Sequence, residues 1–372
     1  MSRVHLGDVA IEHKETCKED KSMYPIVGLE HLTPEQITLQ NWDLNTENTF
    51  TKVFRKGNIL FGRRRAYLKK AAVAPFDGIC SGDITVIEAK EDKIIPELLP
   101  FVIQNDDLFD FAVGKSAGSL SPRVKWTHLQ NYEFELPDKQ KQHELAKVLW
   151  AIEDTRKSYQ QLIKRTDELV KSQFIELFGD PISEKLYKTK TIGEIGEVFT
   201  GTTPSTKKEE YYENKDILFI KPGDISENKV CIVDKAENYI SDKAKKVARI
   251  FPKGSVLVTC IGIIGKIGIA EYESSCNQQI NVIVPSPTVD STYLAYNLLL
   301  VRSNLQDAAN APVVPILNKT DFSKVEVMVP PYERQCEFAT FVEQSDKSKF
   351  GKEMCDKWIL EIQNIYRQGY LI

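Results

Sequence analysis

The sequence DKQKQHELAKVLWAIEDTRKSYQQLIKRTDELVKSQFIELF, residues 138–178, decides the domain organisation because it contains neither glycine nor proline. Positions spaced alternately by four and three run from 145 to 177, and most of them are apolar: Leu145, Leu149, Ile152, Tyr159, Ile163, Val170 and Leu177. This heptad spacing predicts a helix with one apolar seam. At about 1.5 Å per residue the helix would be about 60 Å long, and Gly179-Asp180-Pro181 would end it.

A second helix is expected from residue 331 to the C-terminus. Its seam would be formed by Phe350, Met354, Trp358, Ile362 and Ile365. Two seams in one chain most simply pair with each other. We therefore expect an antiparallel coiled coil that holds two globular domains apart.

The segments that precede the two helices resemble each other, in the same order. Leu6–Val9 matches Ile192–Ile195, Phe54–Leu60 matches Phe251–Leu257, Cys80–Ile87 matches Cys276–Ile283, Ser121-Pro122 matches Val314-Pro315, and Leu136-Pro137 matches Val329-Pro330. The offsets of 186 to 197 residues are far longer than a solenoid repeat and indicate a duplicated domain.

Each copy is expected to be α+β. Short β-rich runs occur at Asp216–Ile220, Ser255–Thr259 and Gln279–Val284, and a helix is expected at Tyr293–Gln306. The predicted organisation is a first domain over 1–137, a central helix over 138–178, a second domain over 179–330 and a C-terminal helix over 331–372.

Composition narrows the class of protein. The chain has 372 residues, of which 42% are hydrophobic and 27% charged, as expected for about two packed domains. Neither a signal peptide nor an apolar run that could span a bilayer is found in the sequence, and the seven cysteines include no CxxC pair. We expect reduced thiols, no metal site and a cytoplasmic protein without membrane contact. All five histidines lie before residue 144, which excludes a histidine-based active site in the second half.

The net charge of −4 hides a segregation of charge. Three windows contain no acidic residue: 48–76, 111–132 and 243–270. The first carries eight lysines and arginines, and the others carry three and six. Clustered bases without acids produce a local positive field that a polyanion can sense.

Several catalytic patterns are incomplete. Val329-Pro330-Pro331-Tyr332 resembles an amino-methyltransferase signature, but the valine has no side chain that could bind an amine. The spacing of Gly262, Gly265 and Gly268 fits no phosphate-binding loop. Asp83 and Glu88 would point to opposite faces of one strand and could not share a metal ion. Cys80 and Cys276 have no neighbouring histidine, which favours buried thiols. The sequence therefore indicates a non-catalytic chain.

Together these features resemble the specificity subunit of type I restriction–modification systems over essentially the whole chain. The resemblance is carried by Thr200–Ser205, Tyr211-Tyr212, Ile220–Ile225 and Asn277–Asn281 in the second half, and by Phe61–Tyr67 and Gly118–Arg123 in the first. The first half departs from the pattern, with His13–Thr16 in place of the Thr-Pro-Ser turn and Ser81-Gly82-Asp83 in place of Asn-Gln-Gln.

The resemblance implies two target-recognition domains that each bind one half of a split, asymmetric site in double-stranded DNA. The helices would space the half-sites and dock two methyltransferase subunits, which would bind S-adenosylmethionine and methylate adenine, with a motor-nuclease subunit for restriction. This chain itself would hold no cofactor. The candidate DNA-binding residues are Arg63, Arg64, Arg65, Lys69, Lys115, Ser119, Arg123, Lys125, Thr203, Ser205, Lys221, Lys266, Asn277, Gln278, Asn318 and Lys319.

Two alternatives remain open at this stage. One is a protein-interaction scaffold whose basic windows are incidental. The other is a self-sufficient DNA-modifying enzyme, against which the missing cofactor loop argues.

Overall fold

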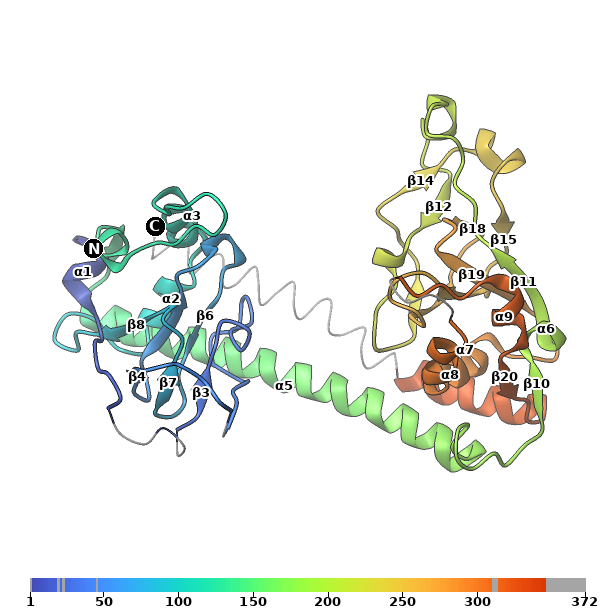
Figure 1. Ribbon diagram of the computed structural model, residues 1–372, viewed down its shortest axis with the longest axis horizontal. Helices are drawn as coiled ribbons and strands as arrows, with labels where there is room; N and C mark the ends of the chain where they lie inside the picture. The colour runs from blue at the N-terminus through green and yellow to red at the C-terminus, as the bar shows by residue number, and fades with distance from the viewer. Residues whose placement is uncertain (1, 19–20, 22–23, 45, 310–313, 346–372) are drawn as a thin grey trace. The chain divides into compact units, whose positions relative to one another are not determined.

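The computed structural model describes residues 2–18, 21, 24–44, 46–309 and 314–345. The chain forms two compact units that divide within one long helix, between Gln160 and Gln161 (Figure 1). Both units combine helices with small sheets, so the α+β class is confirmed. None of the helices in the described ranges has the length and apolarity needed to cross a membrane.

The first unit is built on two sheets. An antiparallel sheet has the strand order β2 (Ala10–Glu12), β8 (Ile84–Ala89), β5 (Ile59–Gly62) and β6 (Ala71–Val73). A smaller sheet has the order β3 (Ile26–Val27), β7 (Gly78–Cys80) and β4 (Lys52–Phe54), with β3 and β7 parallel. β1 (Ser2–His5) pairs with β9 (Glu133–Leu136), and the helices are α1 (Leu6–Val9), α2 (Leu99–Ile103), α3 (Asp106–Gly114) and α4 (Trp126–Leu129).

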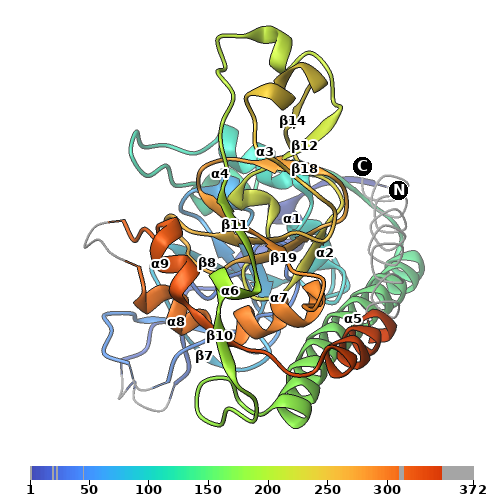
Figure 2. The same ribbon diagram turned by 90° about the vertical axis from the view of Figure 1, so that its right-hand side faces the viewer.

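The second unit repeats this topology. Its larger sheet has the order β11 (Gly196–Thr200), β19 (Ile280–Pro285), β16 (Val256–Thr259), β17 (Ile267–Ala270) and β13 (Cys231–Val233). Its smaller sheet has the order β14 (Tyr239–Ile240), β12 (Ile217–Ile220), β18 (Ser274–Cys276) and β15 (Ile250–Phe251). β10 (Thr189–Thr191) pairs with β20 (Glu326–Met328). α6 (Ile192–Ile195) corresponds to α1, and α7 (Ser291–Leu300) packs on β16 and β17. Figure 2 shows this unit from the side that carries α6, α7 and α8. Strand order and direction agree between the units, which confirms the duplication; β13 and β14 correspond in the first unit to two isolated bridges, Thr38 with Val73 (parallel) and Ile26 with Asp43 (antiparallel).

The duplication is also visible at the level of single residues and single elements. Gly57, between β4 and β5, and Gly254, between β15 and β16, occupy equivalent turns that connect the two sheets, with φ of 90° and 82°, a conformation that favours glycine. The expected strands at 216–220, 255–259 and 279–284 are β12, β16 and β19, whereas the helix expected at 293–306 is two, α7 and α8 (Arg302–Asp307).

Each unit also holds the start of a helix through a buried glutamine. Gln142, near the start of α5 (Lys139–Phe178), donates to the carbonyl of Pro137 at 2.8 Å and accepts from the amide of Ile95 at 2.9 Å. Gln335, in the helix at 332–345, donates to Pro330 at 2.8 Å and accepts from Asp290 at 2.9 Å. The two glutamines are 193 residues apart, like the prolines that they bind.

The seam of α5 differs from the expected heptad pattern. Near its start Leu145 and Leu149 are buried in the core of the first unit. Near its end Val170, Phe174 and Phe178 are buried in the core of the second unit. The spacing there is four and four, so the expected seam positions 173 and 177 are only partly buried. Each end of α5 is therefore a component of a domain core.

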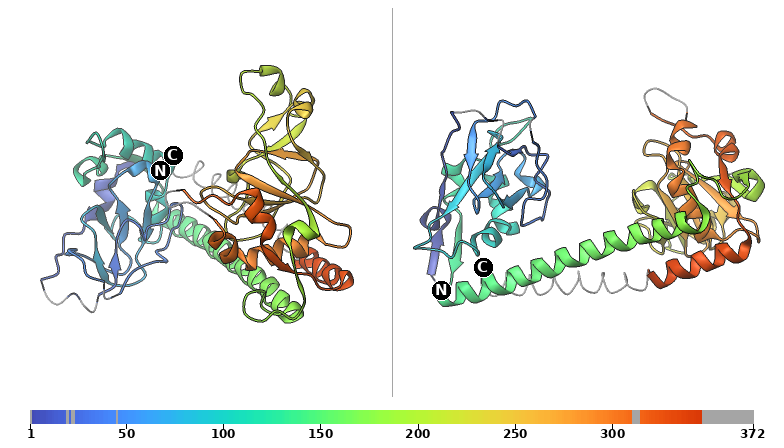
Figure 3. Two further views of the ribbon diagram at one scale, coloured as in Figure 1. Left: turned by 45° about the vertical axis from the view of Figure 1, so that its right-hand side comes forward. Right: turned by 90° about the horizontal axis from the view of Figure 1, so that it is seen from below.

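The helix at 332–345 lies beside the end of α5 (Figure 3). The ring of Phe338 contacts Phe174 and Phe178 with centroid distances of 5.3 and 5.8 Å. Tyr293 of α7 completes this aromatic cluster, stacked on Phe174 at 5.4 Å. The expected seam at Phe350, Met354, Trp358, Ile362 and Ile365 lies outside the described residues, so the full coiled coil stays a prediction.

We expect Phe174→Ala to lower the free energy of unfolding of the second unit by about 3–5 kcal/mol, because it removes the ring at the centre of the aromatic cluster. The matched control is Ile175→Ala, since Ile175 is the next residue of α5 and is exposed. It should change stability by less than about 1 kcal/mol. Urea unfolding, with hydrogen exchange to assign the transition to this unit, measures both. Equal effects would contradict the packing.

Candidate nucleic-acid interface

The two acid-free windows of the first half meet in one place. The backbone amide of Arg65 donates to the carbonyl of Pro122 at 2.8 Å, and that of Val124 donates to Arg63 at 3.0 Å. Arg64 and Arg123 face each other as an antiparallel bridge. Residues 63–65 and 122–124, far apart in sequence, thus form one strip, which we call the arginine strip.

Asp83 anchors the arginine strip from the turn before β8. Its carboxylate accepts from Nε and Nη2 of Arg123 at 2.6 and 3.1 Å, and Nη1 of Arg64 lies 3.6 Å away. The hydrogen bonds from Arg123 are the main cause that lowers the pKa of Asp83. Arg64 also donates from Nε to the Ser121 hydroxyl at 2.5 Å. These guanidinium groups are held in fixed directions and are partly neutralised.

Arg65 and Lys69 flank the 3₁₀ turn at Ala66–Leu68 and have left-handed backbone conformations, with φ of 54° and 50°. At the corresponding places in the second half the residues are Gly262 and Gly265, with φ of 76° and 81°. A residue with a Cβ pays about 1–2 kcal/mol for this conformation. The first half keeps two long cationic side chains where glycine would fit without strain. Such strain at a surface turn points to a role for the side chains themselves.

The free cations of this face are fewer than the sequence suggests. Arg65 is exposed, and no side-chain partner is found for it in the described residues, whereas Lys69 Nζ is bound to Asp106 at 2.6 Å. Lys125 is exposed at the start of α4, and Lys115 lies 5.7 Å from the centre of the Phe111 ring. Ser119 is exposed in the loop between them.

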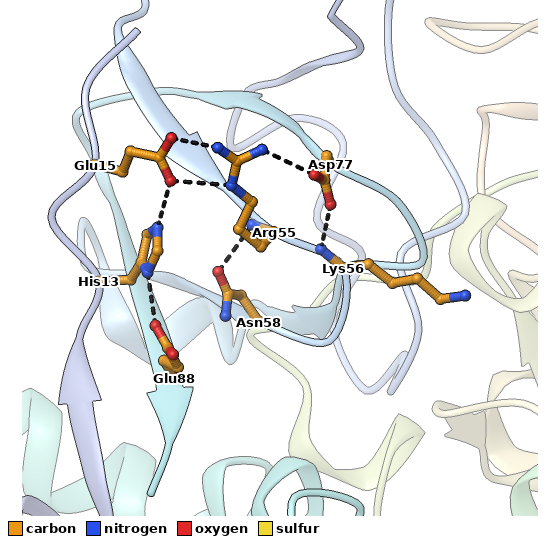
Figure 4. Close-up of polar contacts among 7 residues, drawn as sticks. All are labelled: His13, Glu15, Arg55, Lys56, Asn58, Asp77 and Glu88. Atoms are coloured by element: carbon orange, nitrogen blue, oxygen red, sulfur yellow. Dashed lines mark hydrogen bonds and ion pairs between the residues drawn. The ribbon is translucent and has the colours of Figure 1, made fainter.

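Arg55 lies in the first acid-free window, 48–76, but its side chain is bound within a network of charged residues of the domain (Figure 4). Its guanidinium binds both carboxylate oxygens of Glu15, one at 3.0 Å, and donates to Asp77 at 2.9 Å. His13 links Glu15 to Glu88, with contacts of 3.2 and 2.6 Å. The hydrogen bond from Arg55 is the main cause that lowers the pKa of Glu15. The positive charge of Arg55 is therefore offset inside the domain.

The second half gathers three of the expected residues around a pocket. Thr203, Lys221 and Asn277 line a pocket of about 670 Å³ together with Tyr212 and Phe219. The Thr203 hydroxyl donates to Gln278 Oε1 at 2.6 Å, which links the Thr-Pro-Ser turn to the Asn-Gln-Gln turn. Ser205, two residues further along the first of these turns, is exposed.

The other three expected residues of the second half have structural partners. Lys266 Nζ donates to the carbonyl of Pro222 at 2.9 Å. Asn318 caps α9 (Lys319–Lys324): its side chain accepts from the Asp321 amide at 2.9 Å and donates to the Asp321 carboxylate at 2.8 Å. Lys319 lies 6.0 Å from the centre of the Phe199 ring. Asn318 thus has a capping role that the sequence analysis did not assign to it.

Residues 260–262 repeat the backbone pairing of the arginine strip with different side chains. Gly262 donates to Pro315 at 3.1 Å, and Leu317 donates to Cys260 at 2.9 Å. Ile261 and Ile316 form the bridge that Arg64 and Arg123 form in the first half. The same backbone geometry therefore presents arginines in one unit and apolar residues in the other.

The candidate nuclease and thiol sites do not assemble. Asp83 contacts Arg123, whereas Glu88 contacts His13, so the two carboxylates serve separate networks. Burial raises the pKa of the Cys80 thiol to about 12 and raises that of Cys276 as well. The described residues contain no cluster of side chains that could hold a metal ion.

Sequence reasoning missed Asp83 as an anchor and the aromatic lining supplied by Tyr212 and Phe219. The sequence contains a signal for Asp83. It is an acidic residue within the repeated Cys80–Ile87 block, and this block lies between the two basic windows of the first half. The repeated glutamines, Gln142 and Gln335, could have been found from their offset of 193 residues, the same as that of the Leu136-Pro137 match.

Comparison with known proteins decides the family. The sequence matches the type I restriction modification DNA specificity domain over residues 3–165 and again over 184–353. The chain belongs to this family. The two matches coincide with the two copies of the duplicated fold.

Related specificity subunits occur in archaea and bacteria. The MjaIX specificity subunit of Methanocaldococcus jannaschii is 34% identical over 186 residues, which cover 48% of this chain and 43% of that protein. The HindI specificity subunit of Haemophilus influenzae is 20% identical, covering 76% and 78%. The crystal structure of a type I S subunit from M. genitalium has the same fold, with a TM-score of 0.62, 12% identity and coverage of 98% and 94%.

We expect Arg65→Gly to raise the free energy of unfolding by about 0.5–1 kcal/mol, because glycine relieves the left-handed strain. Arg64→Gly is the matched control: its φ lies outside the left-handed region and it loses contacts to Ser121 and Asp83, so it should destabilise. Urea unfolding of both variants measures the difference. A loss of stability in Arg65→Gly as large as in Arg64→Gly would refute the strain argument.

Acid should release the arginine strip. The folded pKa of Asp83 is depressed, so its contribution to stability is present above the unfolded pKa, near 4, and disappears as the pH falls through the folded value. Wild type should therefore be more stable than Asp83→Asn near pH 6, and the gap should close below about pH 4. Thermal unfolding from pH 3 to 7 measures the gap. Asp154→Asn, at an exposed aspartate of α5, is the control; a gap for Asp83→Asn that is constant with pH would contradict the assignment.

Proposed function

We propose that this chain is the DNA-reading subunit of a type I restriction–modification complex and that its two units read the two halves of a split, asymmetric DNA site. The observation that carries the proposal is the arginine strip, where two acid-free windows meet on a duplicated family fold. A strip of oriented arginines suits contacts with phosphates and with the guanine edge in the major groove.

The two units would read different bases because their surfaces carry different chemistry. The first presents arginines and lysines, whereas the second presents Thr203, Asn277 and Gln278 beside an aromatic pocket. Amide side chains suit the adenine edge, and arginine suits guanine. Unlike surfaces on equivalent frames account for an asymmetric site.

The long helices would set the distance between the half-sites. A helix of 40 residues is about 60 Å long, more than one turn of duplex at about 34 Å. Pairing of this helix with the C-terminal segment as an antiparallel coiled coil is part of the proposal. Two methyltransferase subunits would dock on the helices and supply S-adenosylmethionine for adenine methylation, and a motor-nuclease subunit would join for restriction. The complex would act in the cytoplasm.

The direct test is co-expression of this chain with the methyltransferase subunit encoded beside it, followed by mapping of N6-methyladenine in the host DNA. The proposal predicts methylation at one split motif of two short halves with a fixed gap, present only when both proteins are made. Continuous motifs, or an unchanged methylation pattern in cells that contain the assembled complex, would contradict it.

DNA affinity should fall as the salt concentration rises, and substitution of Arg65 should make this dependence weaker. If Arg65 contacts a phosphate, Arg65→Gly should reduce the slope of log affinity against log salt concentration by about 0.9. Lys93→Ala, which removes an exposed charge in the same unit outside both windows, should leave the slope unchanged. Fluorescence anisotropy with a duplex that carries the mapped motif measures the slopes. Equal slopes for wild type and Arg65→Gly would exclude Arg65 as a phosphate contact.

A further inference from the structure

Leu120 is the most exposed large apolar side chain in the described part of the chain. Leu120 is 92% exposed, whereas the other exposed large apolar residues there range from 40% to 61%. Single exposed apolar residues are common on protein surfaces, but most retain some packing. Leu120 is nearly fully exposed, so its side chain is available to a ligand.

The loop that carries Leu120 is anchored at both ends. Ala117 and Arg123 exchange both backbone hydrogen bonds, at 3.0 and 2.9 Å, and enclose residues 118–122. Gly118 has a φ of 117°, and a Cβ there would lie 3.3 Å from the carbonyl of Ser121. Beyond the loop, Arg123 is fixed by Asp83 and Pro122 is fixed by the amide of Arg65. The structure therefore presents Leu120 at the tip of a short, braced hairpin.

The surroundings of the tip select DNA as the occupant. No acidic residue occurs from Phe111 to Tyr132, and the stem of the loop joins the arginine strip. The loop combines an apolar tip with neighbouring cations. It would therefore complement a ligand that has negative charges outside and apolar groups inside. Stacked base pairs flanked by phosphates have this composition, and proteins insert leucine between base pairs to unstack and kink a duplex.

We propose that Leu120 is a wedge that enters one base-pair step in the half-site read by the first unit and unstacks it. The inference rests on the proposed function and extends it, because sequence would then be read partly through how easily that step opens. Arg123 and Arg65 would hold the flanking phosphates while the leucine enters. At the offset of 193 residues Leu120 corresponds to Val313, which lies outside the described residues, so the proposal concerns the first unit alone.

The test compares full-length wild type with Leu120→Ala and Leu120→Lys on a duplex that carries the mapped motif. Unstacked bases are detected by permanganate for thymine and diethyl pyrocarbonate for purines, and bending is followed by energy transfer between dyes at the duplex ends. Wild type should produce one hyperreactive step and a bend. Both variants should lose them, and Leu120→Ala should bind about tenfold more weakly. Leu120→Lys should lose the signals although it adds a positive charge.

Two controls make the outcome specific. Leu44→Ala removes another exposed leucine of the same unit, outside the basic windows, and should behave like wild type. A mismatch placed at the hyperreactive step removes the cost of unstacking, so it should restore the affinity of Leu120→Ala.

The wedge would be overturned by a footprint and bend that are the same in wild type and Leu120→Ala. It would also be overturned if Leu120→Ala kept both but lost the methyltransferase subunit in a pull-down, since Leu120 would then be a protein contact. In either case salt-dependent binding by wild type leaves the proposed function standing. Absence of duplex binding by the assembled wild-type complex would remove the proposed function and the wedge together.

Discussion

A pair of backbone contacts fixes the surfaces of this protein. Residues 63–65 are bound to 122–124 in the first unit, and residues 260–262 are bound to 315–317 in the second, by equivalent hydrogen bonds. Because these bonds involve only the main chain, the side chains at the same positions are free to diverge. Arginines occupy them in one unit, and isoleucines and glycine in the other. A duplicated frame with interchangeable surfaces is what a subunit that reads two unlike sequences requires.

The distribution of charge follows from this frame. The chain as a whole is slightly acidic, yet the arginine strip concentrates cations where three segments meet. Not every cation of the windows contributes, because Glu15 and Asp77 bind Arg55 within the domain. Asp83 has two effects on the arginine strip. It lowers the net positive charge, and it fixes the direction of the Arg123 side chain. Direction matters for reading base edges, where geometry distinguishes one base from another.

Much of the fold could be predicted from the sequence because the duplication is visible in short blocks that lie on equivalent strands and turns. The heptad pattern of α5 is confirmed at Val170, which is buried, but beyond it Phe174 and Phe178 are the buried positions, as the domain core requires, and Leu177 is only partly buried. The site was harder to predict. The acid-free windows located the arginine strip. The ion pair that Arg55 forms with Glu15, 40 residues away, depends on tertiary contacts that no local pattern reveals. For the same reason Asn318 looked like a reading residue, although its amide caps α9.

The central claim is that one conserved frame carries two independent reading surfaces. Its most direct test replaces residues 63–69 with the equivalent segment 260–265 and maps methylated adenines in cells that also make the methyltransferase subunit. The account predicts a folded chimera in which one half of the motif changes and the other half, with the gap, is retained. Changes in both halves, or in neither, would contradict it.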